Sequence, residues 1–179
     1  MQQAKLYYQD EAGFYLLVSR QASWAPIGRT PILQAPTHSP HLSVAIAISP
    51  RGELFYQIRE SAFKGKGIVY FLKKFLHGKK KKVFLLWDSA TIHTGQAVKG
   101  FLSGLKKERI HLYQTPKYAP ATNAAEQVWQ QIKNVELANC VYKTIKDLKK
   151  ALKEALEKLK AKPQLIQRFF YHQQVAFYN

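Results

Sequence analysis

The chain has 179 residues, a length that suits one domain with a full hydrophobic core and is short for two domains of ordinary size. Its 28 lysines and arginines outnumber 11 acidic residues and give a net charge of +17, which favours a polyanionic partner, nucleic acid first and an anionic membrane surface second. The single cysteine, Cys140, excludes an internal disulfide and a thiolate zinc cluster, and no apolar run approaches the roughly 20 residues of a membrane span, so we expect a cytoplasmic protein.

Between Tyr7 and Ile58 the chain alternates short apolar runs with turn residues, a pattern typical of strands and hairpins. The runs cover residues 6–9, 14–18, 41–48 and 54–58. The segment Ser49-Pro50-Arg51-Gly52 separates the last two runs as a tight turn, so these two strands should pair antiparallel. Residues 20–40 are too rich in proline for a long element and indicate a surface loop, which Trp24 is expected to anchor to the domain.

After Lys64 the apolar residues recur at helical spacing, which predicts a helix that Gly78 ends. Four lysines follow, and the apolar run Val83 to Trp87 then leads into Asp88, as expected of a buried central strand. A helical stretch over residues 97–105 and a short strand over 109–114 complete a strand, helix, strand unit. Such a unit predicts a parallel pair with a right-handed crossover.

The remaining segments are predicted to be helical, over 123 to about 137, over 144–161 and in a short piece after Pro163. Thr144 and Asp147 are spaced as a capping box at the start of the second segment. Three antiparallel strands, then alternating helix and strand, then carboxy-terminal helices predict a mixed α/β sheet flanked by helices. We expect one domain over residues 1–179.

Three acidic residues stand where the chain is expected to enter or leave regular structure. Asp10 closes the stretch Leu6 to Tyr8, Asp88 closes the central strand, and Glu126 opens a helical pattern. Hard oxygen ligands from distant segments suit Mg²⁺. Phosphodiester cleavage can use two divalent ions about 3.5 to 4 Å apart, which carboxylates must hold. Asp10 and Asp88 are expected on neighbouring strands, so that one of them can bridge both ions.

Each acid also has a purely structural interpretation. Asp10 can end a strand at a polar turn, and Asp88 can accept backbone hydrogen bonds within a turn. Glu126 lies three residues after Asn123 and fits a capping role, which is the favoured interpretation for Glu126 taken alone. The three acids together, in this order of strands, favour a metal site.

Four segments carry a family resemblance: Tyr8-Gln9-Asp10-Glu11, Trp24-Ala25-Pro26-Ile27-Gly28, Trp87-Asp88-Ser89-Ala90-Thr91-Ile92-His93 and the block from Pro116 to Lys133. They resemble the catalytic domain of mariner-superfamily bacterial insertion-sequence transposases, which are DDE endonucleases. The last block is the most specific. Its Pro-x-Tyr-x-Pro motif is followed in the family's order by an Asn, the third acid, a Trp and a Lys.

The resemblance implies a ribonuclease-H-like fold and Mg²⁺-dependent hydrolysis at transposon ends, followed by joining of the freed 3′ hydroxyl to target DNA. Asp10, Asp88 and Glu126 would be the catalytic metal ligands, with two Mg²⁺ ions that Mn²⁺ can replace. Ser89 and Ala124 stand where the family commonly has Asn and Pro, and the interval of 38 residues from Asp88 to Glu126 is slightly long. None of these departures removes a carboxylate.

Family members usually carry helix-turn-helix DNA-binding domains before the first acid, whereas Asp10 is almost at the start of this chain. The resemblance therefore implies a catalytic half, from a split or truncated gene or a shortened piece. The implied partners are double-stranded DNA of transposon ends and target, a separate N-terminal DNA-binding half, and a second copy in a homodimer. The implied location is the bacterial cytoplasm, at the nucleoid.

Several further residues have two interpretations. His93 matches the family's histidine and is a candidate contact to DNA, although a surface histidine near a helix start is nearly as good an explanation. Glu11 should point away from Asp10 on a strand and is given a structural role. Trp87 and Trp129 are interpreted as core packing. The remaining candidates for contacts to the DNA backbone, with a solvated loop as the alternative, are Lys79, Lys80, Lys81, Lys82, Lys106 and Lys107.

The sequence thus favours a DNA-cutting and joining enzyme. One alternative is a catalytically idle nucleic-acid-binding or assembly module derived from a transposase, which the charge alone would support. A weaker alternative is an unrelated ribonuclease of the same architecture. Metal-dependent cleavage by variants of the three acids separates the first two.

Overall fold

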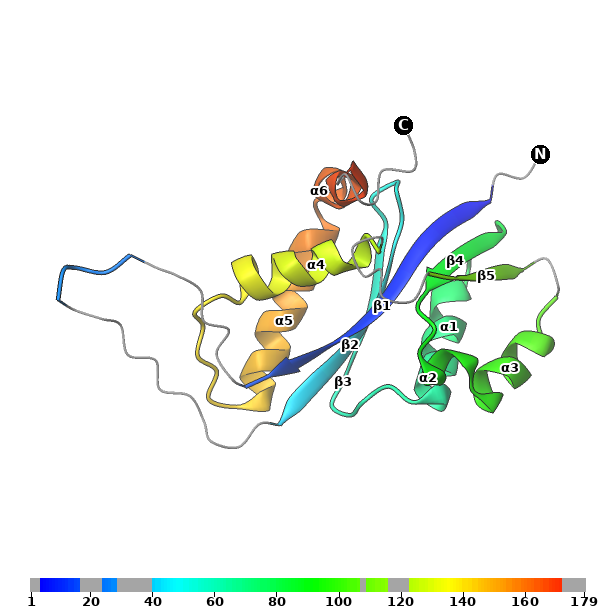
Figure 1. Ribbon diagram of the computed structural model, residues 1–179, viewed down its shortest axis with the longest axis horizontal. Helices are drawn as coiled ribbons and strands as arrows, with labels where there is room; N and C mark the ends of the chain where they lie inside the picture. The colour runs from blue at the N-terminus through cyan, green and yellow to red at the C-terminus, as the bar shows by residue number, and fades with distance from the viewer. Residues whose placement is uncertain (1–3, 17–23, 29–39, 107–108, 116–122, 172–179) are drawn as a thin grey trace.

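A mixed five-stranded sheet forms the centre of the protein (Figure 1). The computed structural model describes residues 4–16, 24–28, 40–106, 109–115 and 123–171. The sheet order is β3-β2-β1-β4-β5. The strands are β1 (Lys5–Tyr15), β2 (His41–Ile48), β3 (Leu54–Arg59), β4 (Val83–Trp87) and β5 (Ile110–Gln114).

The strand directions are those that the sequence predicts. The first three strands pair antiparallel, while β4 pairs parallel with both β1 and β5. The turn between β2 and β3 includes Gly52 at φ +82°, a backbone conformation that glycine adopts without steric cost. The pairing of β1 with β4 runs from Lys5 opposite Val83 to Tyr8 opposite Leu86.

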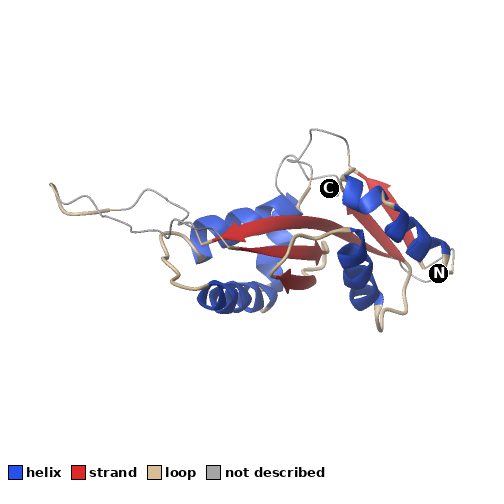
Figure 2. Cartoon of the chain, turned by 90° about the horizontal axis from the view of Figure 1, so that it is seen from below, coloured by secondary structure: helices blue, strands red, loops and turns tan. Residues whose placement is uncertain are grey.

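Helices cover both faces of the sheet, as the two views show (Figures 1 and 2). One face packs against α1 (Gly65–Leu76), α2 (Thr91–Thr94) and α3 (Gln96–Ser103), and the other packs against α4 (Ala125–Gln131), α5 (Ile145–Lys160) and α6 (Pro163–Arg168). A π-helical turn, Ile132–Glu136, continues α4, and a 3₁₀ turn, Phe169–Tyr171, follows α6. The alternation of side chains along β1 sends Tyr7 to the α1 face and Tyr8 to the α4 face.

The local signals read from the sequence are confirmed in α1 and α5. The buried residues of α1 include Ile68, Phe71 and Leu72, which lie on one face at helical spacing. At the start of α5, the Thr144 hydroxyl accepts from the Asp147 backbone N–H and the Asp147 carboxylate accepts from the Thr144 backbone N–H, which forms the predicted capping box.

Two expectations about the first part of the chain are wrong. The apolar runs at 6–9 and 14–18 are not separate strands, because β1 continues through Asp10 to Tyr15 and pairs with β2 from Tyr8 onward. Asp10 therefore lies within a strand rather than at its end. Trp24 does not anchor the loop, since its side chain is fully exposed. Most of the loop at 20–40, the motif at 116–122 and Lys107 lie outside the described residues.

Among the helices that the structure describes, none is both long enough and apolar enough to span a bilayer.

Candidate active site

Asp10 lies on the face of β1 that α4 covers. Its Oδ2 accepts a hydrogen bond of 2.9 Å from the indole Nε1 of Trp129, which is itself buried against Phe14. The start of α4 is tied to the same strand, because the buried Asn123 donates from Nδ2 to the carbonyl of Gln9 at 3.4 Å. These two contacts fix the helix that carries Glu126 beside Asp10.

The Asp10 carboxyl lies in a poorly solvated, negatively charged place. Burial raises its pKa to about 7 from 3.8, the Trp129 hydrogen bond opposes this rise, and the nearby charges of Glu126 and Glu11 add to it. The negative charge of Glu126 contributes to the raised pKa of Asp10, so the two carboxylates repel each other electrostatically. A cation bound between them would remove that repulsion.

Glu126 lies in the first turn of α4, half-buried, and its backbone N–H donates to the carbonyl of Asn123 at 3.0 Å. The Asn123 side chain accepts from the Ala125 backbone N–H at 3.1 Å, which is the capping role predicted for Asn123.

Asp88 follows β4 directly, two residues beyond the last pair of the β1–β4 ladder. Asp10 lies two residues beyond the same pair on β1. Because neighbouring strands run about 4.8 Å apart, the two aspartates start from adjacent backbone positions, as predicted. The Asp88 side chain is half exposed, and its Oδ1 accepts from the Ala90 backbone N–H at 2.9 Å.

His93 joins Asp88 to a second carboxylate. Its Nδ1 lies 2.8 Å from Asp88 Oδ1, and its Nε2 lies 3.0 Å from Glu11 Oε1, while the imidazole stacks on Trp87 at 4.5 Å between ring centroids. Burial of the ring disfavours its charged form, but the hydrogen bond to Glu11 and the charges of Glu11 and Asp88 outweigh burial and raise the pKa of His93. Both ring nitrogens face acceptors, so the imidazolium form satisfies both contacts.

The three predicted ligands are therefore brought together only in part. Asp10 and Glu126 interact, and Asp88 is on the adjacent strand with one oxygen held by His93 and Ala90. Within the described ranges, no three acidic, histidine or cysteine side chains are grouped closely enough to hold a metal ion. The donor chemistry nevertheless fits a hard divalent cation, since three carboxylates supply oxygen and one of them is destabilised by burial and by a second negative charge.

The lysine run lies at the other end of β4. Lys82 precedes Val83, and the six residue steps from Lys82 through β4 to Asp88, at about 3.3 Å each, separate the two residues by about 20 Å. Lys79 is half-buried there, with its ammonium 2.9 Å from the Tyr7 hydroxyl, to which it donates, and 4.6 Å from the centroid of the Tyr7 ring. Lys80 and Lys81 are exposed. This surface is separated from the three acids.

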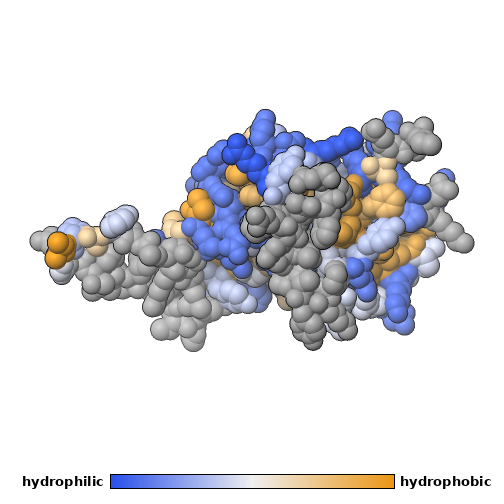
Figure 3. Space-filling model, turned by 45° about the horizontal axis from the view of Figure 1, so that its top comes forward, coloured by the Kyte–Doolittle hydropathy of each residue, from blue (hydrophilic) through white to orange (hydrophobic). Residues whose placement is uncertain are grey.

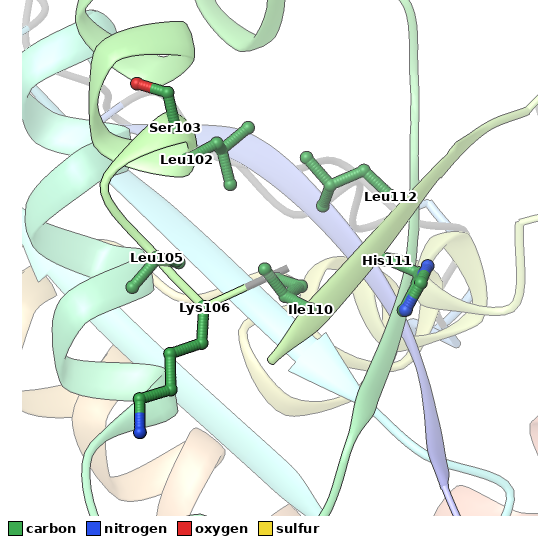
Figure 4. Close-up of a pocket in the computed structure, with 7 residues that line it drawn as sticks. All are labelled: Leu102, Ser103, Leu105, Lys106, Ile110, His111 and Leu112. Atoms are coloured by element: carbon green, nitrogen blue, oxygen red, sulfur yellow. The ribbon is translucent and has the colours of Figure 1, made fainter. Parts of the chain in front are cut away.

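A cavity of about 440 Å³ lies between the end of α3 and β5 (Figure 4). Its walls are mostly apolar, including Leu102, Leu105 and Ile110, with the exposed Lys106 at its edge. Among the described residues that line it, none is acidic. The space-filling view also shows apolar atoms on the side of the molecule that carries β4 and β5 (Figure 3). We assign no catalytic role to this cavity, and Lys106 lies at it rather than at the acids.

Sequence reasoning missed two contacts. Trp129 is buried as predicted, but its indole N–H also holds Asp10. Glu11 points away from Asp10 as predicted, and yet it contacts the active site through His93. The spacing of Trp129 from Glu126 is the one sequence signal that could have suggested its role, because one helical turn places both residues over the same strand.

Comparisons with known proteins give the family. The family model described as DDE superfamily endonuclease matches residues 5–149 of this chain. A search of the curated proteins gives no match. The mariner Mos1 paired end complex with Mg has a TM-score of 0.68 and 15% identity, over 96% of this chain and 55% of that one. The Mos1 paired end complex with Mn has a TM-score of 0.67 and 17% identity, with the same coverage of 96% and 55%.

The catalytic domain of Mos1 mariner transposase has a TM-score of 0.60 and 12% identity, over 96% of this chain and 81% of that domain. These likenesses confirm the ribonuclease-H-like mixed sheet, and this chain spans about half the length of the Mos1 chains in the two complexes. Because the family match extends over most of the sequence, the chain belongs to the DDE superfamily endonucleases.

Proposed function

We propose that this chain is the catalytic domain of a metal-dependent DNA transposase, which hydrolyses phosphodiesters at transposon ends and joins the 3′ hydroxyl to target DNA. The observation that carries the proposal is that Asp10 and Asp88 follow the same residue pair on neighbouring strands, while Trp129 ties the helix that begins with Glu126 to Asp10, in a DDE endonuclease fold. The likeness to Mos1 complexes solved with Mg and with Mn supports divalent cations as the cofactor.

Asp10, Asp88 and Glu126 would hold Mg²⁺, as two ions that Mn²⁺ can replace. The bound ions would supply an activated water or hydroxyl and stabilise the charge on the leaving oxygen. The protein itself would orient the carboxylates that bind the ions. Trp129 donates to Oδ2 of Asp10, and the Ala90 N–H donates to Oδ1 of Asp88, which also lies 2.8 Å from His93 Nδ1, so protein contacts orient both aspartates.

Binding of double-stranded DNA is supported by the net charge of +17. Lys80 and Lys81 are proposed to contact the DNA backbone away from the reacting phosphate, since about 20 Å of strand separates them from Asp88. The salt dependence of DNA binding is measured as the slope of log Kd against log salt concentration. Replacing both lysines by glutamine should reduce this slope by about 2. An unchanged slope would show that these lysines do not contact DNA.

The function is tested by nicking of a duplex that carries the DNA flanking the gene, with Mg²⁺ or Mn²⁺. The reaction is run with and without the N-terminal DNA-binding half that the family resemblance implies. The expected result is metal-dependent nicking that Asp10→Asn, Asp88→Asn and Glu126→Gln each abolish. Glu154→Gln, an exposed carboxylate of α5, is the matched control and should cut normally. Nicking that survives Asp88→Asn unchanged would refute the assignment.

The second candidate is a catalytically idle module derived from a transposase. The observation in its favour is that Oδ1 of Asp88 is engaged by His93 and Ala90, and that no three acidic, histidine or cysteine side chains of the described residues are grouped closely enough to hold a metal ion. An idle module would bind duplex DNA with the same salt dependence and show no metal-dependent cut under any of these conditions.

We also propose that the protein acts as a homodimer at the bacterial nucleoid. The support is an exposed apolar pair, Trp24 and Ile27, whose side chains are both fully accessible in the single chain. Sedimentation of the wild type and of Trp24→Ser with Ile27→Ser tests the dimer. Equal monomer fractions in the two proteins would count against this pair as the contact.

A further inference from the structure

Glu11 reaches the proposed active site from the opposite face of β1. It follows Asp10 in the strand, and alternation turns its side chain toward α2 rather than toward α4. Its Oε1 accepts from two donors, the Gln9 amide at 2.6 Å and the His93 Nε2–H at 3.0 Å. The Glu11 carboxylate is therefore fixed in place and cannot swing freely toward Asp10.

His93 transmits this fixed position to Asp88. The ring is 3% exposed and lies flat on Trp87, with 5° between the ring planes, so its plane is set by packing. The contact between His93 Nε2 and Glu11 and the hydrogen bond between Nδ1 and the Asp88 carbonyl then fix the rotation of the ring within that plane, which keeps Nδ1 2.8 Å from Asp88 Oδ1. Without Glu11, packing against Trp87 and the Nδ1 hydrogen bond to the Asp88 carbonyl remain, but the ring loses its contact at Nε2.

The described contacts of the Asp88 carboxylate involve one of its two oxygens, Oδ1. The Ala90 N–H donates to Oδ1 at 2.9 Å, and His93 Nδ1 lies 2.8 Å from the same oxygen while its hydrogen bond goes to the Asp88 backbone carbonyl at 3.1 Å. These contacts hold Oδ1 of a half-exposed side chain on the side of α2. Such outer partners orient a ligand without touching the ion.

We propose that Glu11 is a positioning residue, which acts through His93 to hold the Asp88 carboxylate so that Oδ2 faces the divalent cation. The inference rests on the proposed function, because it assigns Asp88 to metal binding. Changes to outer partners of metal ligands typically reduce metal affinity or activity by about 10- to 100-fold. We expect that range for Mn²⁺ affinity when Glu11 loses its acceptor.

The first test measures Mn²⁺ binding to the full chain by the electron paramagnetic resonance signal of free Mn²⁺. Glu11→Ala should raise Kd by about 10- to 100-fold. Glu11→Gln keeps a carbonyl oxygen for the His93 N–H and should stay within about threefold of wild type. Glu154→Ala makes the same change at an exposed site of α5 and should leave Kd unchanged. A Glu11→Gln variant that binds as poorly as Glu11→Ala would overturn the proposal.

A double-mutant cycle separates positioning from direct ligation. If Glu11 acts through His93, Glu11→Ala should change Kd by less than about twofold once His93→Ala is present, since the two changes break one chain of contacts. If Glu11 binds the ion directly, the two losses should multiply. Multiplied losses would therefore overturn the positioning role. Should Glu11→Ala fail to fold, Glu11→Asp replaces it, because a side chain shorter by one methylene does not reach Nε2.

A second readout is independent of metal and of cleavage. The imidazole ¹⁵N resonances of His93 and the carboxyl ¹³C resonance of Asp88 should shift together in Glu11→Ala and remain near wild type in Glu11→Gln. An Asp88 resonance unchanged in Glu11→Ala would overturn the inference even if the enzyme is active. Conversely, a wild type whose Mn²⁺ affinity equals that of Asp88→Asn would refute the proposed function, while the resonances would still decide whether Glu11 positions Asp88.

Discussion

The charge state of Asp10 links the stability of the fold to pH. In the folded protein, burial and the neighbouring charge of Glu126 raise its pKa to about 7 from 3.8. A carboxyl with a raised pKa holds its proton better when folded, so the free energy of unfolding falls as pH rises from about 4 to about 7 and stays low above that. Each pKa unit is worth about 1.4 kcal/mol, which sets an upper limit of about 4 kcal/mol.

Asp10→Asn removes that penalty while keeping a carbonyl oxygen for the Trp129 indole N–H. At pH 8 and without divalent ions, the variant should be more stable than wild type by about 2 to 4 kcal/mol after allowance for partial screening by solvent. At pH 4 the two proteins should be nearly equal, because Asp10 is then neutral in the folded state. Urea unfolding followed by circular dichroism at several pH values measures the difference.

The control is Glu154→Gln, which should show no comparable change in its stability difference between pH 4 and pH 8. A gap between Asp10→Asn and wild type that is equal at both pH values would refute the reasoning about burial and the Glu126 charge. Addition of Mn²⁺ at 100 times its Kd should then stabilise wild type by about 2.7 kcal/mol and leave Asp10→Asn unaffected. This second comparison tests the metal site separately from the buried charge.

Three other substitutions test individual contacts. Trp129→Phe keeps the buried ring but removes the donor to Asp10, so Mn²⁺ affinity should fall by about 10- to 100-fold. The rise in Tm at a fixed Mn²⁺ concentration should therefore be smaller than in wild type. An unchanged rise would show that the hydrogen bond does not orient the Asp10 carboxylate. Thr144→Ala removes the capping hydroxyl of α5 and should cost about 0.5 to 2 kcal/mol in urea unfolding, whereas Thr144→Ser should recover most of it. Gly52→Ala should lower Tm strongly, because the backbone has φ +82° and the new Cβ would approach the Pro163 carbonyl oxygen to 2.5 Å; wild-type Tm would contradict the described turn.

The sequence predicts most of the sheet because apolar patterning follows burial there. In the run Val83 to Trp87 and in α1, the positions of the apolar residues in the sequence correspond to the side chains that face the core. The pattern fails at β1, where Gln9, Asp10 and Glu11 interrupt the apolar residues although the backbone continues to pair with β2. Polar residues in mid-strand break the local rule, and such breaks are expected where a site takes precedence over strand propensity.

The geometry of the candidate site could be predicted only in part. Its acids are recognisable by type and order, but the contact from His93 to Glu11 joins residues 82 positions apart and leaves no local periodicity. Likewise, the spacing of Trp129 from Glu126 puts both residues over the same strand, but the sequence does not identify Asp10 as the acceptor of the indole N–H. Long-range polar contacts are set by the folded arrangement of strands and helices, so they become visible only when that arrangement is known.

At the proposed site, the acidic residues lie within a basic protein, so cation binding is expected to be coupled to release of a proton from Asp10. The net charge of +17 would attract the proposed DNA partner, while Asp10 and Glu126 present a local negative charge that repels a phosphate. Divalent cations reverse the local sign and release the proton that Asp10 holds near neutral pH. Mn²⁺ affinity should therefore increase as pH rises through 7, and the proton release should disappear in Asp10→Asn. Calorimetry in two buffers of different ionisation enthalpy measures that release, and a release that persists in Asp10→Asn would assign the proton to another group.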